Sequence, residues 1–407
     1  MDGESRARTP TRKYLDRQDE ILRVASLILN RKGLKEMTLA AVADSFGLVS
    51  TGVAYYFRSK EDLAAACFRR AIAEHNRLIL QAVEQNSLEE RLAQLVSGYF
   101  AMLAGIARGE SDDIALFEDI RSLNDPALEA DYVGMFRNLR RLLAGRGDHS
   151  DRGRLNARTH YLVQQLIWAR YWLAKYEPAD YPRAAERMAD ILIRGVDAAH
   201  WPWAPQCLPT LSATLGDADD RREMFLRAAT QLINEQGYRG ASVERIVARL
   251  DVTKGSFYYR IDAKDDLIEV CYERTIAALR RAQQAAEALN CNGRERLVAA
   301  LAHLIGHQLD GQAPLLRIPT ASVPDSIRRK ILVGCDRIDV RFGSMLSDAI
   351  ADGSVRTIDP QIASHMLTAT AIAGAELPGW LPGGAGARTT EDFVRPAFEG
   401  LAVWTGV

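Results

Sequence analysis

The chain of 407 residues contains one sequence pattern twice. The motif R-x-x-x-[IF]-L-R-x-A at residues 17–25 returns at 221–229, and K-x-D-L-x-x-x-C at 60–67 returns at 264–271. Both matches have the same shift of 204 positions and need no gap. A repeat of about half the chain indicates a duplicated unit rather than the short stacked repeats of a solenoid. The fold must therefore contain the same unit twice.

Helical periodicity runs through both copies. Apolar residues recur at three- and four-residue spacing, as in Leu22, Ala25 and Leu29, and no stretch alternates as a strand would. Glycine and proline clusters break each copy into separate helices. The stretch 201–220 holds three prolines and a glycine among polar residues, which suits a connection. We expect an all-α chain of two tandem units.

Charge and cysteine content limit the function. Lysine plus arginine total 52 against 53 for aspartate plus glutamate, so any nucleic-acid surface must be local. Five cysteines without a C-x-x-C pair fit neither a disulfide framework nor a zinc module and favour the reducing cytoplasm. The N-terminus lacks the apolar core of a signal peptide, and no apolar stretch reaches the roughly 20 residues of a membrane span. We expect a soluble cytoplasmic protein without metal, cofactor or membrane partner.

Short helices follow one another near the start of each copy. A helix is expected to end at Gly33 and at Gly237, where the left-handed conformation of a C-terminal cap costs least. Thr38 and Ser242 then stand where a hydroxyl would cap a second helix. A tight turn, a third short helix and an acidic start of a fourth helix follow. This order is the helix-turn-helix plan, in which the third helix enters the major groove.

The third helix carries a specific resemblance. Residues 253–267, T-K-G-S-F-Y-Y-R-I-D-A-K-D-D-L, resemble the recognition-helix signature of the tetracycline-repressor (TetR) family. Residues 53–63, V-A-Y-Y-F-R-S-K-E-D-L, resemble its second half, but Val49 and Ser50 stand where the signature has threonine and lysine. The resemblance covers about fifty residues of each copy. It implies two TetR-like units, each a three-helix DNA-binding domain followed by a helical effector and dimerisation domain.

Hydroxyl, lysine and tyrosine side chains at helix starts suit contacts with phosphates and base edges. Lys60 and Lys264 resemble the phosphate-contacting lysine of the family. The predicted DNA-binding residues are Thr38, Ser50, Thr51, Tyr55, Tyr56, Lys60, Ser242, Thr253, Lys254, Gly255, Ser256, Tyr258, Tyr259, Arg260 and Lys264. Residues 12–73 carry 11 basic and 7 acidic side chains, against 10 and 10 in 220–276, so the first motif has the stronger field for DNA. Which of the two motifs contributes more to DNA binding stays open.

The resemblance also implies that the last two helices of each unit form a dimer's four-helix bundle. Here they would be 154–176 with 182–199, and 360–377 with 390–403. We expect the two copies to pair within one chain as a covalent pseudodimer, with recognition helices about 34 Å apart. A dimer of two whole chains stays open. The expected organisation is a disordered basic arm (1–13), DNA-binding domains (14–70 and 220–274), effector and dimerisation domains (71–203 and 275–407) and a linker (204–219).

Candidate contacts for a small ligand lie in the helices after each DNA-binding domain. They are Phe100, Met102, Phe117, Tyr132 and Phe136 in the first copy, and His303 and His307 in the second. For any one apolar residue, core packing is the commoner alternative. The two histidines lack the glutamate of a metalloprotease motif, which favours a polar pair beside a pocket over a metal site.

The predicted function is a ligand-responsive transcriptional regulator that binds double-stranded operator DNA and an unidentified small-molecule effector. A repressor is favoured, and activation stays open. The sequence shows no phosphate loop, nucleophile elbow or paired carboxylate motif, which argues against an enzyme. The alternative is a small-molecule-binding or interaction protein in which one or both helix-turn-helix motifs no longer bind DNA.

Overall fold

The computed structural model describes residues 11–47, 50–144, 151–209, 220–240, 242–250, 264–310, 315–316, 323, 325–381, 384, 386 and 388–402. Within these ranges the regular structure is helical, and the one β-type pairing is an isolated bridge between Asp197 and Val355. The all-α fold predicted from the periodicity is confirmed. None of the described helices is long and apolar enough to cross a membrane.

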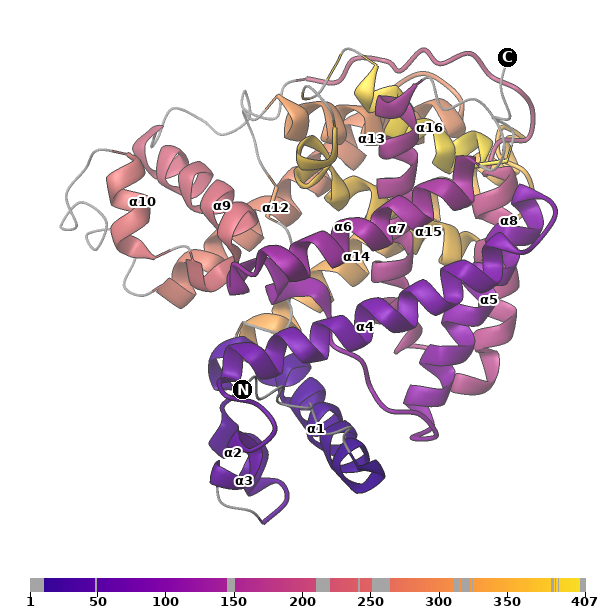
Figure 1. Cartoon of the computed structure of the whole chain (residues 1–407). Helices are drawn as coiled ribbons and strands as arrows, with labels where there is room; N and C mark the ends of the chain where they lie inside the picture. Colours follow the sequence, from indigo (N-terminus) through magenta and orange to yellow (C-terminus); the bar gives the residue numbers. More distant parts are fainter. Residues whose placement is uncertain are drawn as a thin grey trace.

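The two copies present their helices in the same order (Figure 1). The first copy contains α1 (Arg12–Glu36), α2 (Leu39–Asp44), α3 (Ser50–Ala54), α4 (Lys60–Val83), α5 (Leu88–Ala107), the 3-10 helix η1 (Phe117–Leu123), α6 (Pro126–Ala144), α7 (Arg152–Leu173), the 3-10 helix η2 (Pro178–Asp180) and α8 (Tyr181–Arg194). The second contains α9 (Asp220–Gly240), α10 (Val243–Arg249), α12 (Lys264–Glu287), α13 (Gly293–Leu309), α14 (Asp325–Ala351), α15 (Pro360–Ile372), the 3-10 helices η4 (Ala373–Ala375) and η5 (Leu377–Trp380), and α16 (Thr389–Glu399). Between α8 and α9, described residues 195–209 contain no helix. The proline-rich sequence predicts this from residue 201 onwards, whereas the helix predicted to reach residue 199 ends at Arg194.

Matching side-chain caps start equivalent helices in the two copies. Ser87 and Glu90 form a capping box at α5, and Asn292 and Glu295 form the same box at α13. A cap of this kind contributes about 1 kcal/mol. At α5 the counterpart of a residue lies 205 rather than 204 positions further along, because the turn before α13 is one residue longer, and the same shift matches His160 of α7 with His365 of α15.

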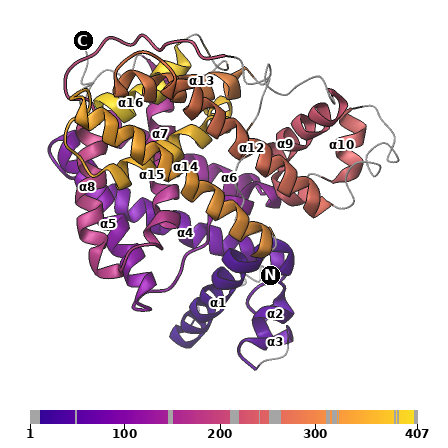
Figure 2. The same cartoon turned by 180° about the vertical axis from the view of Figure 1, so that it is seen from behind.

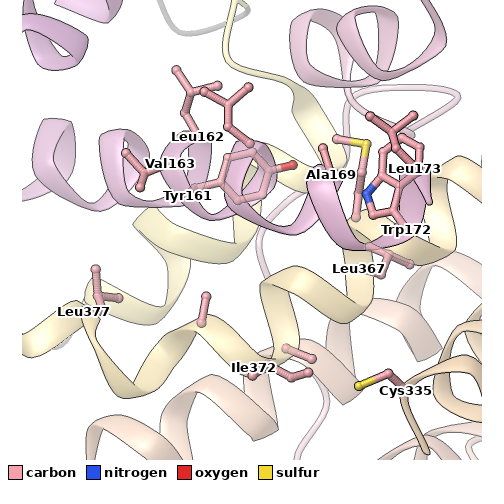
Figure 3. Packing of buried hydrophobic residues seen from close by; sticks show 14 of the residues in the cluster. Tyr161, Leu162, Val163, Ala169, Trp172, Leu173, Cys335, Leu367, Ile372 and Leu377 are labelled. Carbon is pink, nitrogen blue, oxygen red and sulfur yellow. The ribbon is translucent and has the colours of Figure 1, made fainter. Parts of the chain in front are cut away.

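The last two helices of the first copy pack against the last two helices of the second. Both α7 and α8 contact α15 and α16. Figure 3 shows Ala169 and Trp172 of α7 and Leu367 and Ile372 of α15 among the buried side chains of this region. These are the four helices that the sequence predicts for the bundle, with ends shifted by a few residues. Buried apolar side chains of both copies belong to one hydrophobic cluster.

Polar groups buried on α7 meet the backbone of the second copy. The Gln165 amide donates to the Met366 carbonyl oxygen at 3.2 Å and to Thr370 Oγ1 at 3.0 Å. His160 Nε2 lies 3.2 Å from the Ala373 carbonyl oxygen. Because a buried polar group without a partner is costly, these bonds select one register of α7 on α15.

Two glycines allow the chain segments after α8 and α16 to touch. Gly195 has φ +66° and Gly400 has φ +82°, values that favour glycine. A Cβ atom on Gly195 would lie 1.9 Å from the Phe398 carbonyl oxygen, and one on Gly400 would lie 2.1 Å from the Ile193 carbonyl oxygen. Exchanging the copies converts one contact into the other, which indicates an approximate twofold relation between them.

A buried ion pair joins the copies next to these glycines. Asp197, just after α8, accepts bonds of 3.0 Å from both Nε and Nη2 of Arg294 in α13. The two side chains are only 5% and 3% exposed. The Arg294 guanidinium also lies over the rings of Trp201 and Phe398. Figure 2 shows the resulting single helical body, from which α1–α3 and α9–α10 project at different places.

Candidate DNA-binding surface and effector region

The first helix-turn-helix is held together by a cap and a small apolar core. Thr38 Oγ1 accepts from the Ala41 amide at 3.0 Å and starts α2, as the sequence predicts. Val42 of α2 and Val53 of α3 are fully buried, and Phe57 after α3 is 5% exposed. Burying these three side chains orients α3 relative to α2.

The opposite face of α3 and the turn that follows it are open to solvent. Thr51, Tyr55 and Arg58 are exposed, and Tyr55 is 74% exposed. The ring of Tyr55 contacts Tyr56 and Tyr14 of α1 at centroid distances of 5.2 and 5.9 Å. A large exposed ring supported by its neighbours is suited to contact a partner, and phenol and guanidinium groups can donate to phosphate oxygens. The side chain of Ser50 lies outside the described residues.

The predicted lysines occupy the first position of α4 and α12. Lys60 follows the cap Ser59, whose Oγ accepts from the Asp62 amide at 3.0 Å. Lys60 is half-buried, and its Nζ lies 4.0 Å from Glu61 Oε1. Lys264 begins α12, and its side chain is outside the described residues.

The second helix-turn-helix shares the features of the first that are described. Ser242 Oγ accepts from the Arg245 amide at 3.3 Å and caps α10, which buries Ile246 and Val247. The expected helix end at Gly237 is wrong, since α9 continues to Gly240. Glycine permits a left-handed turn without enforcing one, because it also adopts helical angles. The predicted contacts Thr253, Lys254, Gly255, Ser256, Tyr258, Tyr259 and Arg260 lie outside the described residues.

Three of the predicted ligand residues of the first copy form one aromatic group. Tyr132 and Phe136 contact Trp380 of the second copy, and Phe117 contacts Tyr132. Trp380 stacks on Phe136 at 4.0 Å, and Tyr132 lies 5.9 Å from Trp380 and 5.3 Å from Phe117. The group therefore contains rings from both copies.

The other two predicted ligand residues, Phe100 and Met102, lie on α5. Phe100 is 1% exposed, and its ring contacts Trp172 of α7 at a centroid distance of 5.8 Å. Met102 is half-buried against the core. Both side chains take part in core packing, the commoner alternative for an apolar helical residue.

Polar residues lie beside the aromatic group. The Arg170 side chain of α7 donates to Asp113 Oδ1 at 2.5 Å, and the two side chains are 18% and 16% exposed. Burial opposes the charge on Arg170, but Asp113 keeps its pKa above the ordinary value. Burial lowers the pKa of His75, and the charge of Arg170 lowers it further. Burial, which disfavours the ionised phenol, raises the pKa of Tyr99 to about 12.

One family model matches the chain at two places. Bacterial regulatory proteins of the tetR family match residues 21–67 and 225–271, the two helix-turn-helix regions described above. The chain carries two tetR-type DNA-binding regions in tandem. The two matches support a DNA-binding transcriptional regulator.

Individual relatives of the TetR-type chain are distant. The Transposon Tn10 TetC protein of Escherichia coli is 21% identical over 145 residues, 36% of this chain and 73% of that protein. The crystal structure of apo AibR is 22% identical and covers 43% of this chain and 94% of its own, with a TM-score of 0.35. The TetR family regulator PfmR from Thermus thermophilus is 18% identical, with 45% and 99% coverage and a TM-score of 0.36.

In the second TetR-type copy, the predicted ligand residues His303 and His307 face each other on α13. Their ring centroids lie 4.5 Å apart. Among the described residues, His303 Nε2 and His307 Nδ1 are buried and have no hydrogen-bond partner. Burial and the neighbouring His307 lower the pKa of His303 to about 4. No group of three or more possible metal ligands occurs in the part of the chain that the structure describes.

The structure adds a pair of functional candidates, Asn30 and Asn234, which occupy equivalent positions in the repeat. Asn30 of α1 donates to the Ile114 carbonyl oxygen at 2.8 Å and accepts from the Leu116 amide at 2.8 Å. Its counterpart Asn234 of α9 donates to the Leu315 carbonyl oxygen at 2.8 Å. Each asparagine therefore ties the first DNA-binding helix to the loop after α5 or α13.

Proposed function

We propose that this protein is a ligand-responsive, non-enzymatic transcriptional repressor that binds its operator as a single-chain pseudodimer. The observation that carries the proposal is the packing of α7 and α8 against α15 and α16, which joins two TetR-type DNA-binding units within one polypeptide. Because the units are covalently linked, their pairing is intramolecular and does not depend on protein concentration. One chain would then contact two successive turns of the major groove.

The two half-sites of the operator should differ. Copy one exposes Thr51 on α3 and Tyr55 and Arg58 just after it, whereas the sequence of the second recognition region is T-K-G-S-F-Y-Y-R. Different side chains read different base edges. The excess of basic residues in copy one also predicts that it contributes more of the salt-dependent affinity.

Repression would be relieved by a shift between two conformations. An effector bound among the helices after α3 would favour a spacing of the DNA-binding units that no longer matches successive grooves. The Asn30 bonds to the loop at 114–116 offer a direct mechanical connection between that region and α1.

Selection of bound duplexes from a random library, followed by titration of the best sequence at several salt concentrations, tests the proposal. We expect an imperfect palindrome with half-sites about one turn apart. Tyr55→Ala, Lys60→Ala and Lys254→Ala should each weaken binding, and Lys60→Ala should reduce the salt slope by about 1. The control Arg183→Ala removes an exposed charge from α8 and should leave binding unchanged.

Other results would count against the proposal in specific ways. Wild-type affinity in Tyr55→Ala and Lys60→Ala would exclude copy one from the DNA surface. A perfect palindrome that is lost only through Lys254→Ala would mean that two chains bind together and that copy one is structural. No enriched duplex at all would favour the alternative of a ligand-binding protein that has lost DNA binding.

A further inference from the structure

We propose that the effector site of copy one takes an organic carboxylate with an apolar body, whose carboxylate replaces Asp113 as the partner of Arg170. The inference rests on the proposed function and specifies the chemistry of its ligand. One half-buried cation and a row of incompletely covered rings that leads away from it carry the proposal.

The cation has a single acidic partner. Among the residues that the structure describes, Arg170 forms an ion pair only with Asp113, through one bond of 2.5 Å to Oδ1. A guanidinium has five donor hydrogens in a planar fork, which matches a carboxylate with two parallel bonds. The single bond to Asp113 therefore leaves most of the donor hydrogens of Arg170 available for a ligand carboxylate.

The apolar part of the site is a row of four rings, His75, Phe117, Tyr132 and Trp380. Successive centroids lie 5.2, 5.3 and 5.9 Å apart. All four side chains are half-buried, although each contacts other rings. Aromatic surface left uncovered by protein is favourable for an apolar ligand to cover.

The cation and the row of rings meet at His75 and Tyr99. Their ring centroids lie 5.7 Å apart, and both groups interact electrostatically with Arg170. Because burial lowers the pKa of His75, its imidazole is neutral at pH 7 and does not compete with Arg170 for an anion. A molecule with a carboxylate at one end and an apolar body fits this arrangement of charge and surface.

The second copy does not repeat this combination of a cation and an imidazole. The counterparts of His75, Tyr99 and Arg170 are Leu279, Leu304 and Ala375, which provide no cation and no imidazole. The site also needs both copies, because Trp380 at the far end of the row belongs to the second. We therefore assign one carboxylate site to each chain.

Replacement of Asp113 by a ligand carboxylate on Arg170 would also affect the DNA-binding domain. Asp113 Oδ2 accepts from the Asn30 amide at 3.1 Å, and the same amide donates to Ile114. A ligand carboxylate on Arg170 frees Asp113 and weakens the attachment of the loop at 113–116 to α1. A shift of α1 moves the recognition helix α3, whose neighbour Tyr55 contacts Tyr14 of α1.

The test uses the full chain and a fixed set of probes: octanoate, decanoate, benzoate, phenylacetate and 4-phenylbutyrate, each beside its methyl ester. Binding is measured by thermal shift and by tryptophan fluorescence, since Trp380 lies in the row. We expect at least one carboxylate to raise the melting temperature and to change the fluorescence, and its ester to do neither. If no acid of the set binds, the inference is overturned.

Two variants separate ligand binding from a merely structural ion pair. Arg170→Gln should weaken carboxylate binding at least tenfold. Asp113→Asn keeps one acceptor oxygen but removes the charge that pairs with Arg170, so it should strengthen carboxylate binding at least fivefold, a gain that a structural role would not produce. The control Glu110→Gln removes a nearby surface charge and should leave the affinity unchanged. Unchanged affinity in Asp113→Asn would refute the exchange of partners.

Failure of this inference differs from failure of the proposed function. A chain that selects an operator but binds none of the carboxylates keeps the proposed function and loses the carboxylate site. A chain that binds a carboxylate through Arg170 but selects no operator keeps the site and loses the regulator. In a chain that does both, the bound acid should lower operator affinity in wild type and not in Arg170→Gln.

Discussion

Replacing Asp197 by asparagine should weaken the attachment of the two copies to each other. The change preserves the size of the side chain but removes the charge that faces Arg294, whose own side chain is 3% exposed. The guanidinium cannot lose its proton and cannot reach water in the fold. Leaving such a charge without its partner costs about 3–5 kcal/mol, so we expect a loss of that size in the free energy of unfolding.

Compared with an uncharged pair of side chains, the ion pair of Asp197 with Arg294 contributes little to the stability of the fold. Burial raises the pKa of Asp197 even though Arg294 stands beside it, which means that the ionised carboxylate is less favourable in the fold than in water. Breaking the pair is therefore costly, while replacing both partners together need not be. The double variant Asp197→Asn with Arg294→Met should recover most of the loss seen in either single variant.

Urea unfolding followed by far-ultraviolet circular dichroism measures these changes, with variants compared at the first transition because a chain of this size need not unfold in one step. The control Glu74→Gln breaks the ion pair of Glu74 with Arg77, whose side chain is 50% exposed, and should cost less than about 1 kcal/mol. Equal losses in Asp197→Asn and Glu74→Gln would refute the reasoning. So would strict additivity of the two single variants in the double variant.

Three further predictions concern the backbone, acid stability and thiol reactivity. Gly195→Ala should lower the melting temperature more than Gly109→Ala, because both glycines have positive φ but only a Cβ at position 195 would clash; equal effects would contradict the close approach of the copies. Stability should fall as pH falls from 6.5 towards 4, because the unfolded state protonates His303 while the fold, with its pKa lowered to about 4, does not; a thermal melt series in which His303→Gln has the same pH slope as wild type would count against this. In the native protein Cys207 should react with a disulfide reagent much faster than Cys67, whose thiol is buried and has its pKa raised to about 11; comparable rates, measured by mass spectrometry of the labelled chain, would argue against that burial.

The features that sequence predicted well are governed by local physics. Thr38 and Ser242 cap their helices because a hydroxyl just before an apolar helical pattern satisfies a free amide wherever it occurs. The start of α4 at Lys60 follows from the same rule, because Ser59 caps it. Gly237 shows the limit of such local rules, because a glycine allows a helix to end but the surrounding residues decide whether it does.

Contacts between the copies could not be derived in this way. Asp197 and Arg294 are 97 residues apart, and neither position belongs to a motif or a periodic pattern. The ring of Trp380 on Phe136 likewise joins distant segments, so the sequence predicted Phe136 as a ligand residue without its cross-copy partner. Asn30 and Asn234 carried a visible signal, their coincidence in the repeat, but only the structure shows that each holds a loop.

The mass of the chain bound to its selected operator tests the central claim most directly. Native mass spectrometry of the complex, at protein concentrations from well below to well above the dissociation constant, counts chains per duplex. A single-chain pseudodimer predicts one chain of 45.1 kDa on an operator with two half-sites at every concentration. Two chains on that operator, with occupancy that rises as the square of the concentration, would contradict the account.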